Sequence, residues 1–227
     1  LGCGYWGKNL ARNLHALGAL ACVCDPSELG RAKAIEIAGD IKITSEFESV
    51  FADASIDAVA IATPAPTHYE LAVAALRAGK DVFVEKPMTL RTAEAVQLQS
   101  HAAHYERVLM VGHLMEYHPA IQKISQLAMD GELGDLHYIV SNRLNFGIVR
   151  TVENAWWSLA PHDVSVVLRL MGSLPESITC CGGDFITRGV DDLANAVLRF
   201  ANGRQAQISV SWLHPAKERR LFVVGSR

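Results

Sequence analysis

The chain has 227 residues, of which half are hydrophobic and 20% are charged, as is typical of a folded globular protein. The formal net charge of -3 indicates no basic surface, so we expect no nucleic-acid partner. Five cysteines, an odd number without a C-x-x-C pair, predict neither a disulfide framework nor a metal site. No apolar stretch approaches the roughly 20 residues of a membrane span, and no signal peptide is recognisable. We expect a cytoplasmic protein without a membrane partner.

The first half of the chain alternates short apolar runs with helix-like stretches. Strands are predicted at residues 19–24, 41–44, 57–63, 81–84 and 107–112. Helices are predicted at residues 8–17, 28–38, 47–52, 68–78 and 92–104. Strands that are apolar along their length and alternate with helices indicate a parallel sheet covered on both faces.

The pattern changes near His113. Helices are predicted at residues 118–129 and 161–171, and strands at 136–146, 177–181, 195–200, 204–212 and 220–224. Asn202-Gly203 is a strong hairpin signal. The predicted fold class is α/β: a doubly wound parallel sheet at residues 1–112, then an α+β domain with a largely antiparallel open sheet at residues 113–227. Since the pattern opens on a turn and closes within a strand, we expect both ends to be truncated.

A glycine-rich motif, G-x-G-x-x-G, opens the first predicted helix, with the residues Gly2, Gly4, Tyr5, Trp6 and Gly7. An acidic residue, Asp25, ends the next predicted strand. In a Rossmann domain the glycines let the backbone approach a pyrophosphate, and the acidic residue binds the adenosine ribose. Because a carboxylate at Asp25 would repel a 2'-phosphate, NAD is the expected cofactor.

A second motif, A-T-P-A-P-T-H, follows the strand predicted at residues 57–63. It should lie at the carboxyl edge of the sheet, where ligands of such folds bind. The candidate cofactor-binding residues here are Thr63, Pro64, Thr67 and His68. Thr67 could equally cap the following helix, and His68 is expected to pack the loop rather than to catalyse.

A third motif, Glu85-Lys86-Pro87, ends the strand predicted at residues 81–84. The strand delivers a carboxylate and an amine to the same edge of the sheet, and the proline is where a cis peptide bond could occur. A lysine beside an oxidised nicotinamide would have its pKa lowered by the positive ring, which favours proton transfer or hydroxyl binding. We predict that Glu85 and Lys86 contact the cofactor and that Lys86 is catalytic, although a surface salt bridge is an alternative.

The three motifs, in this order and spacing, resemble the Gfo/Idh/MocA family of oxidoreductases. The resemblance implies a Rossmann domain followed by a domain whose open sheet mediates oligomerisation, hence a homo-oligomer, dimer or tetramer. It also implies that Lys86 lies at the nicotinamide and the substrate. The alternative of another class is a non-catalytic, dinucleotide-sensing regulator on the same fold, which would be expected to lose its catalytic residues.

The family's second catalytic element is an Asp-x-x-x-His pattern that opens a helix of the second domain. By this resemblance His162 is the histidine, while Ser158 stands where many members have aspartate. The identity of the general base, His162 or Lys86, is therefore open. Asp163 is expected to be a helix N-terminal carboxylate stabilised by the helix dipole.

The segments G-H-L-M-E-Y-H-P, S-N-R-L-N, S-L-A-P-H-D and S-W-L-H-P resemble a narrower group, the dehydrogenases that oxidise the 3-hydroxyl of UDP-N-acetylglucosamine or its uronate. The likeness implies a nucleotide-sugar substrate. It places around that substrate Tyr117, Arg143, Asn145, Arg150, Asn154 and His162. Arginine suits a pyrophosphate or a uronate because its fork binds two oxygens at once. Oxidation of inositol, glucose or a dihydrodiol is the alternative within the family.

Overall fold

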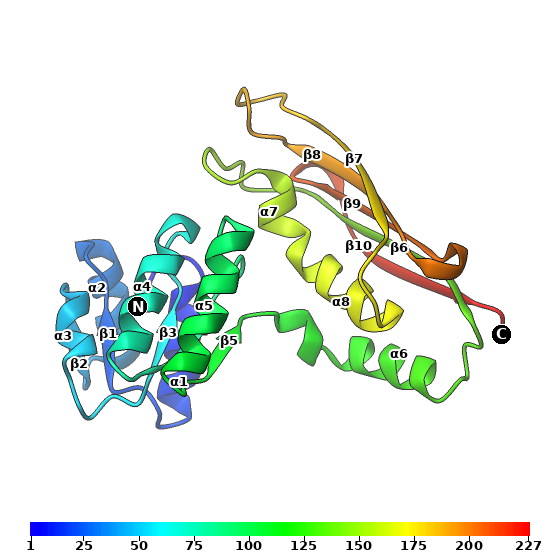
Figure 1. Ribbon diagram of the computed structural model, residues 1–227. Helices are drawn as coiled ribbons and strands as arrows, with labels where there is room; N and C mark the ends of the chain where they lie inside the picture. Colours follow the sequence, from blue (N-terminus) through cyan, green and yellow to red (C-terminus); the bar gives the residue numbers. More distant parts are fainter. The chain divides into compact units, whose positions relative to one another are not determined.

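The computed structural model describes residues 1–227 and divides them into two compact units, Leu1–Gly112 and His113–Arg227 (Figure 1). The division coincides with the change of sequence pattern at His113. No helix in either unit has the length and apolar character that crossing a membrane requires.

The first unit alternates strands and helices along its whole length. Its strands are β1 (Cys22–Cys24), β2 (Lys42–Thr44), β3 (Ala58–Ile61), β4 (Asp81–Val84) and β5 (Leu109–Val111). Its helices are α1 (Gly7–Ala16), α2 (Glu28–Ala38), α3 (Phe47–Phe51), α4 (His68–Arg77) and α5 (Thr92–His104), with a short 3-10 turn η1 (Ala65–Thr67). All strand pairs are parallel: β1 with β2, β3 with β4, and β4 with β5.

The backbone of Leu1 and Gly2 joins the two groups of strands. Gly2 N donates to Cys24 O at 2.8 Å, Ala62 N donates to Leu1 O at 2.8 Å, and Leu1 N donates to Ala60 O at 2.5 Å. The order across the unit is therefore β2, β1, Leu1–Gly2, β3, β4, β5, the order of a doubly wound Rossmann sheet.

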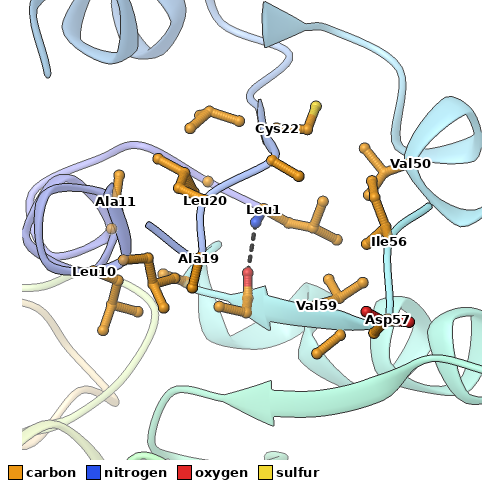
Figure 2. Close-up of a pocket in the computed structure, with 18 of the residues that line it drawn as sticks. Leu1, Leu10, Ala11, Ala19, Leu20, Cys22, Val50, Ile56, Asp57 and Val59 are labelled. Atoms are coloured by element: carbon orange, nitrogen blue, oxygen red, sulfur yellow. Dashed lines mark hydrogen bonds between the residues drawn. The ribbon is translucent and has the colours of Figure 1, made fainter. Parts of the chain in front are cut away.

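A cavity of about 380 Å³ lies beside Leu1, between α1, β1 and β3 (Figure 2). Its lining is mostly apolar, with Leu10, Leu20, Ile56 and Val59, and it also includes Ser55 and Asp57. Because it offers neither a cluster of charges nor the polar ends of the strands, it suits neither a phosphate nor a sugar. The candidate residues lie instead at the carboxyl edge of the strands.

Helices cover both faces of the parallel sheet, as the apolar strands predict. Neighbouring residues of β1 face opposite layers: Val23 packs with Ala11 of α1 and Ala34 of α2, whereas Cys24 belongs to the cluster that includes α4 and α5. A strand buried on both faces can alternate its side chains between two apolar layers, which explains its lack of polar residues.

The second unit combines helices with a five-stranded sheet. Its helices are α6 (Pro119–Met129), α7 (Ala155–Leu159) and α8 (Pro161–Met171), with 3-10 turns η2 (Leu114–Tyr117) and η3 (Ala201–Gly203). Its strands are β6 (Leu136–Phe146), β7 (Ser177–Gly183), β8 (Leu193–Arg199), β9 (Gln205–Ser211) and β10 (Leu213–Gly225). The sheet order is β10-β6-β9-β8-β7, antiparallel except for the parallel pair β6 and β9. The predicted largely antiparallel sheet is confirmed.

Only one face of this sheet is covered. Helices α7 and α8 pack against it (Figure 1), and alternate residues of β8 and β9 are buried there, among them Ala196, Leu198, Ile208 and Val210. The opposite face keeps exposed aromatic side chains, Tyr138 on β6 and Phe222 on β10. This period-2 pattern is that of a sheet with one open face.

Candidate functional site

The glycine turn of the first unit is packed on one side and open on the other. Gly2 has φ +83°, and a Cβ on it would lie 2.9 Å from the backbone of Ala62 and Thr63. A Cβ on Gly7 would lie 2.0 Å from Gly2 O. At Gly4 no atom lies within 4 Å of the position of a Cβ. The turn therefore closes tightly on the strand end and leaves its backbone approachable at Gly4, which a pyrophosphate requires.

Asp25 holds the turn to the end of β1. Its Oδ2 accepts from Cys3 N at 2.7 Å, and its Oδ1 accepts from Ser27 N at 2.8 Å and from Ser27 Oγ at 2.6 Å. Burial alone would raise the pKa of Asp25, but the hydrogen bonds from Ser27 and Cys3 lower this pKa below its ordinary value of 3.8. The charged carboxylate thus lies buried beside the glycine turn, and Gly30 is the residue that leaves room for it.

The loop after β3 is stabilised by hydrogen bonds between its own residues. Thr67 Oγ1 donates to Pro64 O at 2.8 Å and lies within hydrogen-bond distance of Thr63 Oγ1, at 2.7 Å, and it makes no side-chain cap to α4. The helix cap, one of the two roles considered for Thr67, is therefore not formed, because the intervening turn η1 places its hydroxyl against its own loop. Its hydrogen bonds stiffen the loop instead.

His68 lies beneath this loop with 1% of its surface exposed. Its Nδ1 lies 2.8 Å from Pro87 O and its Nε2 lies 2.8 Å from Thr63 O. The ring thus ties the loop after β3 to the loop after β4. His68 therefore packs the loop, as predicted, and both of its ring nitrogens face backbone carbonyl groups.

The Glu85-Lys86-Pro87 motif follows β4, and its Lys86–Pro87 peptide bond is cis. Glu85 Oε1 accepts from the indole Nε1 of Trp6 at 2.5 Å, across 79 positions of sequence. Glu85 Oε2 also accepts from Lys86 N at 3.3 Å. A Cβ on Gly112, just after β5, would lie 3.0 Å from this carboxylate. Glu85 therefore joins the glycine turn to the strand end that carries Lys86, a link that the sequence did not predict.

In the second unit, His162 lies in the first turn of α8, next to a buried ion pair. Asp163 accepts from Arg143 Nε at 2.6 Å, from Arg143 Nη2 at 3.1 Å and from Ser141 Oγ at 2.7 Å. Both donors lie on β6. The expectation that Asp163 is simply a dipole-stabilised helix carboxylate is therefore incomplete, because its hydrogen bonds fix the start of α8, and so His162, against the sheet.

The structure brings some of the predicted substrate residues together and not others. Arg143 and Asn145 lie on β6 beside the start of α8, near Arg219, whose Nη2 donates to Asn145 Oδ1 at 2.8 Å. Arg150 pairs with Glu153 at 2.8 Å, and Asn154 Oδ1 accepts from Trp157 N at 3.0 Å as the cap of α7. Tyr117 ends η2 and is exposed. The side-chain contact of Asn154 is this local helix cap. Arg219 was not among the substrate residues predicted from the sequence.

No metal centre is formed, because no group of three or more histidine, cysteine, aspartate or glutamate side chains could hold an ion. All five cysteines are free thiols.

Family models match nearly all of the chain. Residues 1–113 match the oxidoreductase family with an NAD-binding Rossmann fold, and residues 121–227 match the Gfo/Idh/MocA C-terminal domain. The chain belongs to the Gfo/Idh/MocA family of oxidoreductases. The first unit of this oxidoreductase is thus an NAD-binding Rossmann domain, and the resemblance inferred from its motifs is confirmed.

Several relatives of this chain are dehydrogenases of named substrates. The UDP-N-acetylglucosamine 3-dehydrogenase of Acidithiobacillus ferrooxidans is 33% identical over 98% of this chain and 69% of its own length. The structure of that organism's UDP-N-acetylglucosamine 3-dehydrogenase GnnA has a TM-score of 0.87, with 30% identity over 99% of this chain and 72% of that chain. Inositol 2-dehydrogenase of Rhizobium meliloti is 27% identical over 93% of this chain and 67% of its own length.

GenD2 from gentamicin A biosynthesis, solved in complex with NAD, has a TM-score of 0.91. It is 27% identical over 99% of this chain and 68% of that chain. The Gfo/Idh/MocA oxidoreductase described here therefore spans roughly two thirds of the length of these relatives.

Proposed function

We propose that this protein oxidises a secondary hydroxyl, that of C3, on a UDP-linked N-acetylamino sugar or its uronate, with NAD as the hydride acceptor. The observation that carries the proposal is the carboxyl edge of the first unit, where the glycine turn, Asp25 and Glu85–Lys86 meet through Cys3 N and Trp6. The 33% identity to a UDP-N-acetylglucosamine 3-dehydrogenase supports the choice of sugar.

The residues at this edge suit a dinucleotide. The open backbone at Gly4 and the start of α1 would receive the pyrophosphate, and the charged Asp25 would favour a ribose with a free 2'-hydroxyl over a 2'-phosphate. When bound, NAD supplies the acceptor for the hydride.

Lys86 and His162 share the chemistry of the hydroxyl group in this proposal. As the C–H bond of the carbinol carbon breaks and its electron pair leaves as hydride, the hydroxyl proton passes to His162 and a carbonyl forms. Lys86 donates a hydrogen bond to the oxygen as negative charge develops on it. The two roles could be exchanged, since Ser158 replaces the family's aspartate. The Asp163–Arg143 ion pair supports His162 by anchoring the first turn of α8.

Replacement of Lys86 by methionine tests the proposal. Lys86→Met should reduce NADH formation from UDP-N-acetylglucosamine and from its uronate by about a hundred- to a thousandfold, because the oxygen loses its cationic donor. The dissociation constant of NAD should stay within a few fold. Lys123→Met, the same change at an exposed position of α6, is the control and should keep full turnover. Unchanged turnover in Lys86→Met would exclude its assigned role.

A polyol dehydrogenase is the second candidate, and the 27% identity to an inositol 2-dehydrogenase favours it over other sugars. Initial rates with UDP-N-acetylglucosamine, its uronate and myo-inositol, measured in parallel, separate the two candidates. Reduction of NAD by inositol alone would replace the nucleotide sugar with a free polyol.

We also propose that the protein is a homo-oligomer, dimer or tetramer, assembled through the open face of the second-unit sheet. The exposed aromatic residues Tyr138 and Phe222 on that face support this arrangement.

A further inference from the structure

Two arginines lie next to each other on the helix-covered face of the second-unit sheet. Arg143 of β6 and Arg219 of β10 are directly opposite each other in the antiparallel register. Both share the face of Ile139, Leu221 and the start of α8, since side chains two positions apart on a strand point the same way.

Only one of these two guanidinium groups is paired with a carboxylate. Asp163 is bound by Nε and Nη2 of Arg143, whereas Arg219 forms no salt bridge. Arg219 donates only to uncharged acceptors: Asn145 Oδ1 at 2.8 Å, Glu218 O at 3.3 Å and Leu144 O at 3.4 Å. The Glu218 carboxylate is itself engaged, by Asn142 at 2.7 Å and Arg220 at 3.6 Å.

The environment of Arg219 favours an anion. Partial burial and the charge of Arg143 lower the pKa of Arg219, only partly offset by Asp163. The Arg219 side chain is nevertheless exposed to solvent and so open to a ligand. A guanidinium that is held in place, partly desolvated and short of a counter-ion binds carboxylate or phosphate oxygens strongly, because its planar fork presents two parallel donors.

We infer that Arg219, oriented by Asn145, binds an anionic group of the substrate, a carboxylate or a phosphate. This inference rests on the proposed function for the identity of the substrate, and it makes Arg219 a specificity-determining residue. Arg143 is bound to Asp163 and serves as the positioning residue for the first turn of α8.

The chain offers a matched control one residue away. Arg220 points to the opposite face of β10, where its guanidinium lies 5.6 Å from the ring centroid of Phe222 and pairs with Glu218. Arg219→Gln and Arg220→Gln therefore remove the same charge from the same strand, on different faces.

Calorimetric titration of the full-length protein with UDP, UDP-N-acetylglucosamine and UDP-N-acetylglucosaminuronate tests the inference without turnover. Arg219→Gln should raise the dissociation constant of the uronate roughly tenfold or more, the loss expected for a charge-assisted hydrogen bond. Arg220→Gln should stay within twofold of the wild type. Arg219→Lys keeps the charge but loses the two parallel donors of the guanidinium, so its dissociation constant should lie between those of the two glutamine variants.

The three ligands distinguish the source of the anion. If Arg219→Gln weakens the binding of the uronate alone, Arg219 contacts its carboxylate. If the variant weakens the binding of all three ligands equally, Arg219 contacts the diphosphate. Equal affinities in Arg219→Gln and Arg220→Gln for every ligand would overturn the inference, as would failure of the wild type to bind any of them. Binding that depends on Arg219 without any NADH formation by the wild type would instead uphold the anion site and refute the proposed reaction.

Discussion

At the scale of single residues, the hydrogen bond between Trp6 and Glu85 organises the candidate cofactor site. Trp6 belongs to the glycine turn and Glu85 to the strand end that carries Lys86, so this contact fixes one motif relative to another. Both residues were predicted to contact the cofactor. Their direct contact could not be read from the sequence, because nothing in either motif indicates which way the indole turns.

Replacing Trp6 by phenylalanine removes this bond and keeps an aromatic ring. We expect Trp6→Phe to weaken NAD binding about three- to tenfold, since the affected hydrogen bond is to a charged group at a partly exposed position. Titration with NAD, followed by calorimetry, measures the change. Trp157→Phe in α7 is the matched control, because both tryptophans are 39% exposed. If the two variants bind NAD equally well, the Trp6–Glu85 contact does not organise the site.

Three of the cofactor-site candidates that the sequence identified share one property: each follows the end of a strand. Asp25, Thr63 and Glu85 come directly or within two residues after β1, β3 and β4, so parallel pairing alone brings them to one edge. Arg219 was missed for the opposite reason. The apolar pattern predicted a strand beginning only at Arg220, whereas β10 begins at Leu213, and its partner β6 lies about 75 positions earlier.

At the scale of elements, most helices and strands were predicted close to their observed bounds, and α7 and β10 are the exceptions. Helices α2 and α5 and strand β6 begin and end at the predicted residues. Helix α7 has only five residues, too few to show a helical period, and it was missed. The parallel pairing of β6 with β9 was also missed, because pairing between distant strands is decided by packing rather than by local pattern.

The connection between β7 and β8 depends on one buried carboxylate, Asp192, which is 1% exposed. It accepts from Trp212 Nε1 at 2.5 Å and from the backbone N of Phe185 and Ile186, both at 2.8 Å. Burial alone would raise the pKa of Asp192, but these three hydrogen bonds lower it below the ordinary value of 3.8. The contribution of this group to stability is therefore complete above pH 3.8 and is lost as the pH falls through the lower, folded-state pKa.

Asp192→Asn should lower the free energy of unfolding by about 2 kcal/mol at pH 7, because the bonds lose their charged acceptor. The difference in the free energy of unfolding between the variant and the wild type should decrease below about pH 4, where the wild type loses the same charge. Urea denaturation across this pH range measures both effects. Asp184 is an exposed aspartate in the same connection, and Asp184→Asn should lower the free energy of unfolding by less than Asp192→Asn does. A difference that does not change with pH would show that the Asp192 charge contributes nothing.

At the scale of the whole molecule, the second-unit sheet has one face that its own helices leave uncovered. Tyr138 and Phe222 are 46% and 49% exposed there. They share that face because Val224 pairs with Tyr138, and Phe222 lies two positions from Val224. Exposed aromatic residues on a regular, flat surface are typical of interfaces between protein chains. The proposed homo-oligomer would bury them against a second copy of the same face.

Phe222→Asp tests this assembly. A charge that replaces this aromatic side chain in the proposed interface should raise the dissociation constant of the oligomer roughly thirtyfold or more, which corresponds to the loss of one dominant interface residue. Sedimentation velocity at micromolar concentration should then show an oligomer for the wild type and a shift toward monomer for the variant. Leu174→Asp places the same charge at another exposed apolar residue, which follows α8 and lies outside the sheet. The control should remain assembled, since its side chain is not on the open face. A monomeric wild type, or equal dissociation of both variants, would remove this face from the proposed interface.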